Sequence, residues 1–297
     1  MYKGFLKNIT EPSLEVLRYV ILIAMLFYIL TPLVWLFITT FHPRGGPYLE
    51  IPEKPTLENF LILFGIVKMR VGAAAHPVYM HKWLLNSFII AITTMIIVVV
   101  LSAMAGYALS RLKFRGKSIL MASLLIIGFM PTIAKLLPLY KLCIMLGFIN
   151  NLIGVAIVVA SGALPVQIWI MKGFFDHIPR DLEEQAWIFG CSKLSALFRV
   201  VMPAAGPGLM VVAFFSFLAG WGNFTVPLIL IRTETLFPVS LGIASVFLHH
   251  PGEIGLAVEY GPLCALSLIY ALPSIILYYL TRRYLMHIKL ARIEVGV

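Results

Sequence analysis

The sequence predicts an all-α polytopic membrane protein with six transmembrane helices and with both termini in the cytoplasm. Three observations support this fold class. The 297 residues are 61% hydrophobic and only 12% are charged, about half the charged share of a soluble domain. Stretches without Asp, Glu, Lys or Arg recur along the chain, and about 20 apolar residues are enough for a helix to cross a bilayer. Together they exclude a soluble globular protein and make membrane lipid the expected surroundings.

Six segments meet this length requirement. The first is too long for a cleaved signal peptide and lacks a small-residue cleavage pattern, so we expect a retained helix. The third continues past one cation, Lys135, and the fifth is expected to begin near Gly206 because prolines flank that point. The uncharged stretch 235–252 contains Pro and adjacent His residues, and fits a re-entrant or surface loop better than a seventh span. The six expected spans cover residues 17–41, 83–110, 118–140, 150–172, 206–231 and 260–281.

The positive charges set the expected orientation. Most Lys and Arg lie on the side of the two termini, and one tight turn, Arg111–Lys117, is especially basic. Short basic loops stay in the cytoplasm, which places residues 176–203 inside and residues 42–82 outside. We therefore expect a multi-pass protein of the plasma or inner membrane. The formal net charge of +10 then reflects topology, and no nucleic acid partner is expected.

One face of the second span carries small residues. Ser102, Gly106 and Ser110 recur every four residues, so they share one side of a helix. Small side chains there permit another helix to approach closely.

The expected spans contain no Asp or Glu, although proton- and ion-coupled transporters usually carry such groups at depth. This disfavours a self-powered pump, but backbone carbonyls can bind Na⁺, so that alternative stays open. His249, His250 and Glu253 fit a polar outside loop better than a metal site. Gly116-Lys117-Ser118 lacks the earlier glycine of a phosphate-binding loop. We expect no enzyme activity, no catalytic residue, no metal and no cofactor on this chain.

The most informative stretch is the inside loop after the fourth span, which has the pattern of a helix–turn–helix. Asp181 is expected to cap the first helix, with Glu184 as its capping-box partner. Gly190 permits a left-handed turn, Ser192 caps the second helix and Pro203 ends it. Such an amphipathic element can dock into a groove of another protein. Its apolar residues at helical spacing are Leu182, Ala186, Phe189, Leu194, Leu197, Phe198 and Val201.

Several residues of this loop form a recognisable motif, namely Glu183-Glu184-Gln185-Ala186, Gly190, Phe198 and Met202-Pro203. The motif resembles the EAA loop of permease subunits of ABC importers. Gln185, Phe189 and Cys191 depart from the family pattern, while the glutamate, the turn and the terminating proline match it. The resemblance implies that this segment is a coupling helix seated in an ATPase groove. The residues it assigns to ATPase coupling are Glu183, Glu184, Ala186, Gly190, Phe198 and Pro203.

Further segments are similar to the maltose-type carbohydrate permeases of this family. The likeness extends from Trp83 to the C-terminus, whereas the outside loop after the first span carries little of it. The similar segments are Asn86-Ser87, Tyr107-Ala108 with Arg111, Gly116-Lys117, Pro138–Tyr140, Leu146–Asn150, Lys172–Phe175, Ile178-Pro179 and Trp221–Phe224.

The resemblance implies one half of a translocation pathway. A sister permease subunit would supply the other half, two ATPase subunits would bind the ATP, and an extracellular solute-binding protein would deliver the sugar substrate. A disaccharide such as maltose or trehalose is the leading expectation. The C-terminal tail, residues 290–297, would insert between the ATPase subunits, with a frayed terminus as the alternative.

For the substrate path, Trp221 and Asn223 on the fifth span are the candidates. An indole can stack on the apolar face of a sugar, and an amide can hydrogen-bond its hydroxyls. The alternative is that both residues only pack between helices or at the membrane interface.

Three other functions remain open. Within the same family, the solute could be glycerol phosphate or a related polyol. A stand-alone secondary transporter is the alternative from another class, although no internal repeat is evident. A membrane enzyme ranks last because no catalytic constellation is evident.

Overall fold

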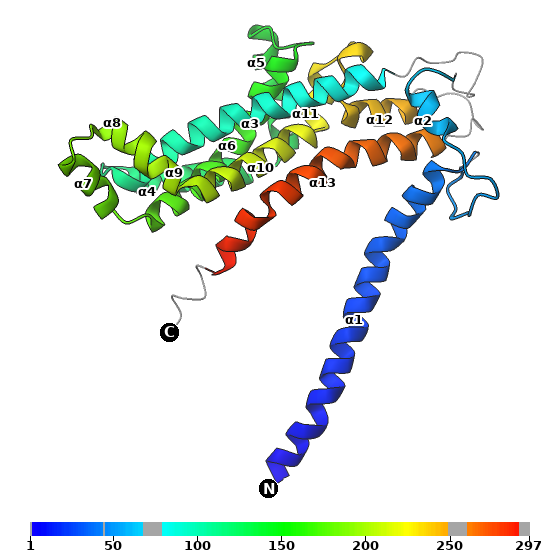
Figure 1. Ribbon diagram of the computed structural model, residues 1–297. Coiled ribbons are helices and arrows are strands. Elements are labelled where there is room, and N and C mark those ends of the chain that lie inside the picture. The colour runs from blue at the N-terminus through cyan, green and yellow to red at the C-terminus, as the bar shows by residue number, and fades with distance from the viewer. Residues whose placement is uncertain (1, 44, 68–78, 249–259, 291–297) are drawn as a thin grey trace. The chain divides into compact units, whose positions relative to one another are not determined.

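The computed structural model describes residues 2–43, 45–67, 79–248 and 260–290. Within these ranges every regular element is a helix, as Figure 1 shows. The all-α class predicted from the sequence is therefore confirmed. By its internal contacts the chain divides into two compact units, Met1–Val78 with His250–Ile269, and Tyr79–His249 with Tyr270–Val297.

Four helices in the described part of the chain are long and apolar enough to cross a bilayer, and a fifth is obtained if one bent pair counts as a single span. The bent pair consists of Lys193–Ala204 and Gly206–Trp221, which meet at 74°. The four single helices correspond to the expected first, second, fourth and sixth spans, whereas the third and fifth are interrupted. Their apolar segments are Glu15–Thr40, Met80–Arg111, Leu152–His177 and Tyr260–Leu285.

The first unit contains α1 (Tyr2–Thr40), α2 (Glu58–Leu63) and the first ten residues of α13 (Tyr260–Leu290). The side-chain amide of Asn59 on α2 donates to the carbonyls of Thr40 (2.8 Å) and His42 (3.0 Å), and so satisfies acceptors at the end of α1. The side chains of residues 15–34 on α1 are exposed. Because they are almost all apolar, this helix suits a surrounding of lipid.

The second unit is built around α3 (Met80–Arg111), which packs lengthwise against α6 (Leu152–His177) and α10 (Gly206–Trp221). A Cβ at Gly106 on α3 would lie 2.8 Å from the Cβ of Met171 and 2.9 Å from the backbone nitrogen of Lys172. Ser102 and Ser110 on the same face are buried. The close approach of another helix, predicted from the four-residue repeat, is therefore confirmed.

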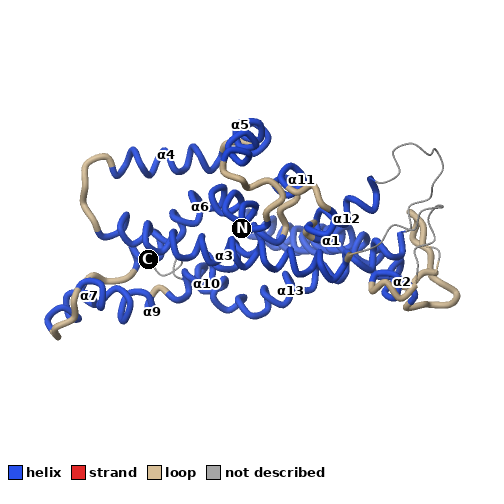
Figure 2. Tube along the Cα trace, turned by 90° about the horizontal axis from the view of Figure 1, so that it is seen from above, coloured by secondary structure: helices blue, strands red, loops and turns tan. Residues whose placement is uncertain are grey.

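The expected third span is broken into α4 (Lys117–Phe129) and α5 (Thr132–Met145). Figure 2 shows α5 turned away from the line of α4. Pro131 has no amide hydrogen for the carbonyl of Ile127, four residues earlier. The ammonium group of Lys135 donates to that carbonyl instead (2.9 Å). The one cation inside the expected span thus stabilises a helix break.

The expected fifth span is also broken, because α10 ends at Trp221 and the short helix α11 (Thr225–Leu230) follows. The side-chain oxygen of Asn223, one residue before the N-cap residue Phe224, accepts from the amide of Val226 in the first turn of α11 (3.0 Å).

The segment after α11 forms the 3₁₀ helix η2 (Glu234–Leu236) and the ten-residue helix α12 (Val239–Leu248). Ten residues are too few to cross a bilayer. The segment nevertheless packs on α3, where the amide of Asn86 donates to the carbonyls of Thr235 and Phe237 (3.0 Å each). The hydroxyl of Ser87 accepts from the amide of Val239 (2.8 Å). Residues 234–248 are therefore a packed segment of the second unit, and residues 249–252 lie outside the described ranges.

Candidate functional site: the loop between α6 and α10

The loop between α6 and α10 has the helix–turn–helix form that the sequence predicts. Its first helix is α7 (Asp181–Ile188). The second arm is one continuous helical segment made of α8 (Lys193–Ala196), the π-helical turn η1 (Leu197–Val201) and α9 (Met202–Ala204). The loop forms one end of the second unit in Figure 1.

Gly190 forms the turn between the two arms in the left-handed conformation, with φ of +86°. Its amide donates to the carbonyl of Trp187 (2.9 Å), and the amide of Cys191 donates to that of Ala186 (2.9 Å). These two bonds form a Schellman motif, which satisfies the last carbonyls of α7. The hydroxyl of Ser192 accepts from the amide of Ser195 (3.2 Å) and caps the second arm. The predicted roles of Gly190 and Ser192 in local structure are confirmed.

The start of α7 differs from the prediction. Arg180 occupies the N-cap position and no side-chain capping bond is present there, so Asp181 is not the cap. Asp181, Glu183 and Glu184 all lie in the first turn instead. Carboxylates in that turn still interact favourably with the positive end of the helix dipole.

The end of the second arm also differs, because the helix continues one residue past Pro203 to Ala204. Proline offers no amide hydrogen to the carbonyl of Arg199, four residues earlier. Leu197–Val201 adopt the wider π-helical turn, in which the amide of Met202 donates to the carbonyl of Leu197. The chain then bends by 74° into α10.

The outer surface of the loop is apolar. Ala186, Leu197 and Val201 face inward and are buried, whereas four large apolar side chains flank the Gly190 turn and face outward. These four, which we call the loop tip, are Ile188, Phe189, Leu194 and Phe198, at 81%, 86%, 69% and 64% exposed. Glu184 and Pro203 are exposed beside them. Exposed apolar groups of this size mark an interaction surface.

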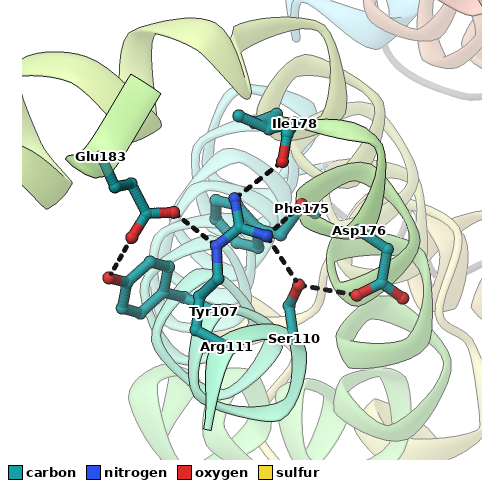
Figure 3. Close-up of polar contacts among 7 residues, drawn as sticks. All are labelled: Tyr107, Ser110, Arg111, Phe175, Asp176, Ile178 and Glu183. Carbon is teal, nitrogen blue, oxygen red and sulfur yellow. Dashed lines mark hydrogen bonds and ion pairs between the residues drawn. The ribbon is translucent and has the colours of Figure 1, made fainter. Parts of the chain in front are cut away.

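Glu183 lies on the opposite side of α7 and is buried, with 3% of its surface exposed. Its carboxylate accepts from the hydroxyl of Tyr107 (2.9 Å) and from Nε of Arg111, both on α3. The Arg111 and Glu183 side chains are only 9% and 4% exposed. Figure 3 shows the carboxylate between these two donors. The first turn of α7 is thus fixed to the C-terminal end of α3.

The same guanidinium group caps α6. Nη1 of Arg111 donates to the carbonyl of Phe175 (3.0 Å) and Nη2 to that of Ile178 (2.9 Å). These carbonyls belong to the last turn and C-cap of α6, where acceptors lack partners within the helix. Asp176 forms a second link, because its carboxylate accepts from Ser110 (2.6 Å) on α3 and pairs with Lys172. One arginine therefore connects three helix ends (Figure 3).

The residues assigned to coupling by sequence fall into two groups. Glu184, Gly190, Phe198 and Pro203 lie on the exposed side of the loop, while Glu183 and Ala186 face the rest of the chain. Neighbouring positions on a helix point about 100° apart, so the two glutamates cannot face the same way. The carboxylate of Glu183 is occupied by Arg111 and Tyr107 of its own chain.

The two candidate substrate residues also lie in different environments. Trp221 is 2% exposed, and its indole stacks against Phe217 and Tyr270 with ring centroids 5.7 and 5.3 Å away. Its Nε1 donates to the carbonyl of Tyr270 (3.1 Å). This geometry favours the interhelical alternative for Trp221, because both ring faces are covered. Asn223 is partly exposed at the break between α10 and α11.

Sequence reasoning missed the polar contacts of Tyr107, Ser110, Arg111 and Asp176. It assigned Arg111 to topology and to a family likeness. The pair with Glu183 joins positions 72 residues apart, and no spacing rule connects such positions. The one available signal was that Arg111 and Glu183 both lie in segments expected on the same side of the membrane.

Two predictions lie outside the described residues. They concern the segment with His249, His250 and Glu253, and the tail from residue 291 onward.

Comparison with known proteins gives the family. Residues 98–285 match the model of the binding-protein-dependent transport system inner membrane component. The chain is 30% identical over 280 residues to the trehalose/maltose transport system permease protein MalG of Thermococcus litoralis, covering 91% of this chain and 95% of that protein. It is 30% identical over 253 residues to the trehalose transport system permease protein SugB of Mycobacterium tuberculosis, covering 84% and 86%.

The fold is shared with a solved structure. It superimposes on a chain of a bacterial ABC transporter that imports the acidic polysaccharide alginate, with a TM-score of 0.76 and 17% identity, over 93% of this chain and 97% of that one. The chain belongs to the family of binding-protein-dependent transport system inner membrane components, and it is a multi-pass inner-membrane permease rather than an enzyme.

Proposed function

We propose that this chain is one of two permease subunits of an ATP-driven importer for a carbohydrate. A sister permease supplies the other half of the pathway, two ATPase subunits bind ATP, and an extracellular solute-binding protein delivers the sugar. The sugar assignment is supported by relatives named for trehalose and maltose and for maltodextrin. A related importer is known in complex with a periplasmic protein bound to an alginate pentasaccharide. A disaccharide such as maltose or trehalose is the first candidate.

The observation that carries this proposal is the contrast between the two sides of α7. The loop tip and Glu184 face outward, while Glu183 fixes the helix to α3. An exposed apolar tip fits a groove on an ATPase subunit. The capped turn at Gly190 and the buried ion pair of Glu183 with Arg111 make the loop stiff. A stiff segment transmits a displacement instead of absorbing it.

The proposal includes six spans with both termini in the cytoplasm. α4 with α5 and α10 with α11 each form one interrupted span, because α4 and α10, at 13 and 16 residues, cover only about 20 and 24 Å of a core of about 30 Å. The bond between Arg111 and Glu183 supports the orientation. It puts the basic turn 111–117 at the same end of the unit as the loop between α6 and α10.

Asn223 is the proposed substrate contact of this chain. It lies at the break between α10 and α11, and broken helices often supply polar groups to a transport path. Its side-chain oxygen accepts from the amide of Val226 in α11, and its amide NH₂ is the group that would bind a sugar hydroxyl.

The test is purification from native membranes through a tag on the intact chain. We expect an ATPase and a second permease to copurify. In proteoliposomes, the sugar-loaded binding protein should stimulate ATP hydrolysis and ATP-dependent sugar uptake. Reproducible absence of both partners, with transport by the purified chain alone, would establish a secondary transporter instead.

A further inference from the structure

We infer that Arg111 is a positioning residue that joins α3, α6 and α7 into one mechanical unit, so that displacement of the loop tip moves the inner ends of two spans together. The inference rests on the proposed function, because it assumes that an ATPase moves the loop. It adds the route by which the movement enters the membrane.

The first step is the way in which Arg111 uses its donors. Nε donates to the carboxylate of Glu183 on α7, Nη1 to the carbonyl of Phe175 and Nη2 to that of Ile178. The planar guanidinium group thus contacts α7 with one edge and the end of α6 with the other (Figure 3). The backbone of Arg111 itself is the last turn of α3. A lysine carries one point charge and cannot reproduce this fork.

The second step is burial. The side chains of Arg111 and Glu183 are both more than nine-tenths buried, and the hydroxyl of Tyr107 fills a further acceptor site of the carboxylate (2.9 Å). Separating two buried, opposite charges leaves each one unpaired and poorly solvated. The contact is therefore expected to persist while the loop moves.

The third step is that α3 and α6 are already locked together next to this contact. Ser110 of α3 donates to Asp176 of α6 (2.6 Å), and Asp176 also pairs with Lys172. One turn away, the Gly106 backbone lies against Met171 and Lys172 so closely that no side chain fits between them. The two helices thus have little room to slide, and α7 is attached to both through Arg111.

The first experiment compares Arg111→Lys with a matched control, Lys113→Ala, which removes an exposed cation from the same basic turn. Both variants are studied as complete transporters in proteoliposomes. The readouts are the amount of assembled complex, ATP hydrolysis stimulated by the loaded binding protein, and sugar uptake per ATP hydrolysed. For Arg111→Lys we expect assembly and hydrolysis to remain while uptake per ATP falls at least about tenfold, which corresponds to 1.4 kcal/mol. Lys113→Ala should match the wild type.

An unchanged ratio of uptake to hydrolysis in Arg111→Lys would overturn the inference. So would a parallel loss of uptake and hydrolysis in an assembled complex, because a merely structural role lowers both together.

A second experiment replaces the polar contact with a covalent one, and does not depend on how Arg111→Lys assembles. Tyr107 and Glu183 are changed to Cys in a chain whose native Cys143, Cys191 and Cys264 are Ala. We expect low uptake per ATP before treatment and recovery after a short bifunctional methanethiosulfonate joins α3 to α7. The single-cysteine variants treated with the same reagent are the control. A ratio that stays low or falls further after cross-linking would overturn the inference, since it would mean that α7 must move relative to α3.

The two proposals fail in different ways. If the proposed function is wrong, the wild-type chain shows no ATP-dependent uptake with any partner set. If only the inference is wrong, the wild type is active, and the variants give the contradicting results stated above for the two experiments.

Discussion

Arg111 and Glu183 lie 72 positions apart in the sequence, yet their side chains form a buried ion pair between the last turn of α3 and the first turn of α7. The neighbouring Glu184 is exposed. Two consecutive glutamates therefore differ in role, one holding the loop to its own chain and the other available to a partner. This division gives the loop a fixed base and a free outer surface.

The two glutamates provide a matched pair of substitutions. Glu183→Gln should destabilise the purified permease by up to about 3–5 kcal/mol, because it leaves the charge of Arg111 buried without a counter-ion. Glu184→Gln should change stability by less than about 0.5 kcal/mol, as is usual for surface positions. Thermal unfolding in detergent and limited proteolysis of the loop measure the difference. Equal unfolding temperatures for the two variants would contradict the assigned division of roles.

Gly190 is constrained by its backbone and not by space, because nothing lies within 4 Å of a Cβ added there. Its φ of +86° costs an ordinary L-residue about 1–2 kcal/mol and a β-branched one more. We expect Gly190→Val to lower both assembly with the ATPase and substrate-stimulated ATP hydrolysis, while Gly190→Asn, which tolerates this conformation, stays close to the wild type. Normal assembly and hydrolysis in Gly190→Val would show that the turn is not needed.

Gly106 is constrained by space. A Cβ there would come within 3 Å of the Met171 side chain and of the Lys172 backbone on α6, so Gly106→Ala requires the two helices to move apart. We expect a loss of about 1–3 kcal/mol, measured by thermal unfolding of the purified permease. Gly162→Ala on α6 is the control, because a Cβ at that position meets nothing within 4 Å. If both alanine variants unfold together with the wild type, the packing at Gly106 is looser than described.

Substitutions at Trp221 and at Asn223 should have different effects on the KM of sugar uptake. Trp221→Ala removes a buried ring stacked on Phe217 and Tyr270 and should cost about 3–5 kcal/mol of stability, with little change in the KM of the protein that still assembles. Asn223→Asp keeps an oxygen that can accept from the amide of Val226 but loses the NH₂ donors, so its KM for sugar should rise. Sugar uptake measured over a range of concentrations decides between them. A raised KM for Trp221→Ala with an unchanged one for Asn223→Asp would reverse the assignment.

Local features of the fold were predictable from sequence because short-range chemistry determines them. The turn at Gly190, the cap at Ser192 and the close approach at Gly106 each follow from one residue type in one conformation or spacing. The breaks at Pro131 and after Trp221 did not follow from composition. Both lie in stretches that are mostly apolar, so mean hydropathy alone does not mark them.

The candidate site was predictable in outline only. The EAA-like pattern located the loop, but it gave no way to tell which glutamate faces inward. That depends on Tyr107 and Arg111, which reach α7 from a distant helix. The burial of Trp221 likewise depends on Tyr270, a residue 49 positions away.

The central claim, that the loop between α6 and α10 docks on an ATPase subunit, is tested most directly by site-specific cross-linking in the intact transporter. Single cysteines at Phe189, at Phe198 and at Leu146, an exposed residue after α5, are introduced into a chain without its native cysteines. The account predicts adducts to the ATPase subunit from Phe189→Cys and Phe198→Cys, and none from Leu146→Cys. No ATPase adduct from either tip position in an active complex would contradict it.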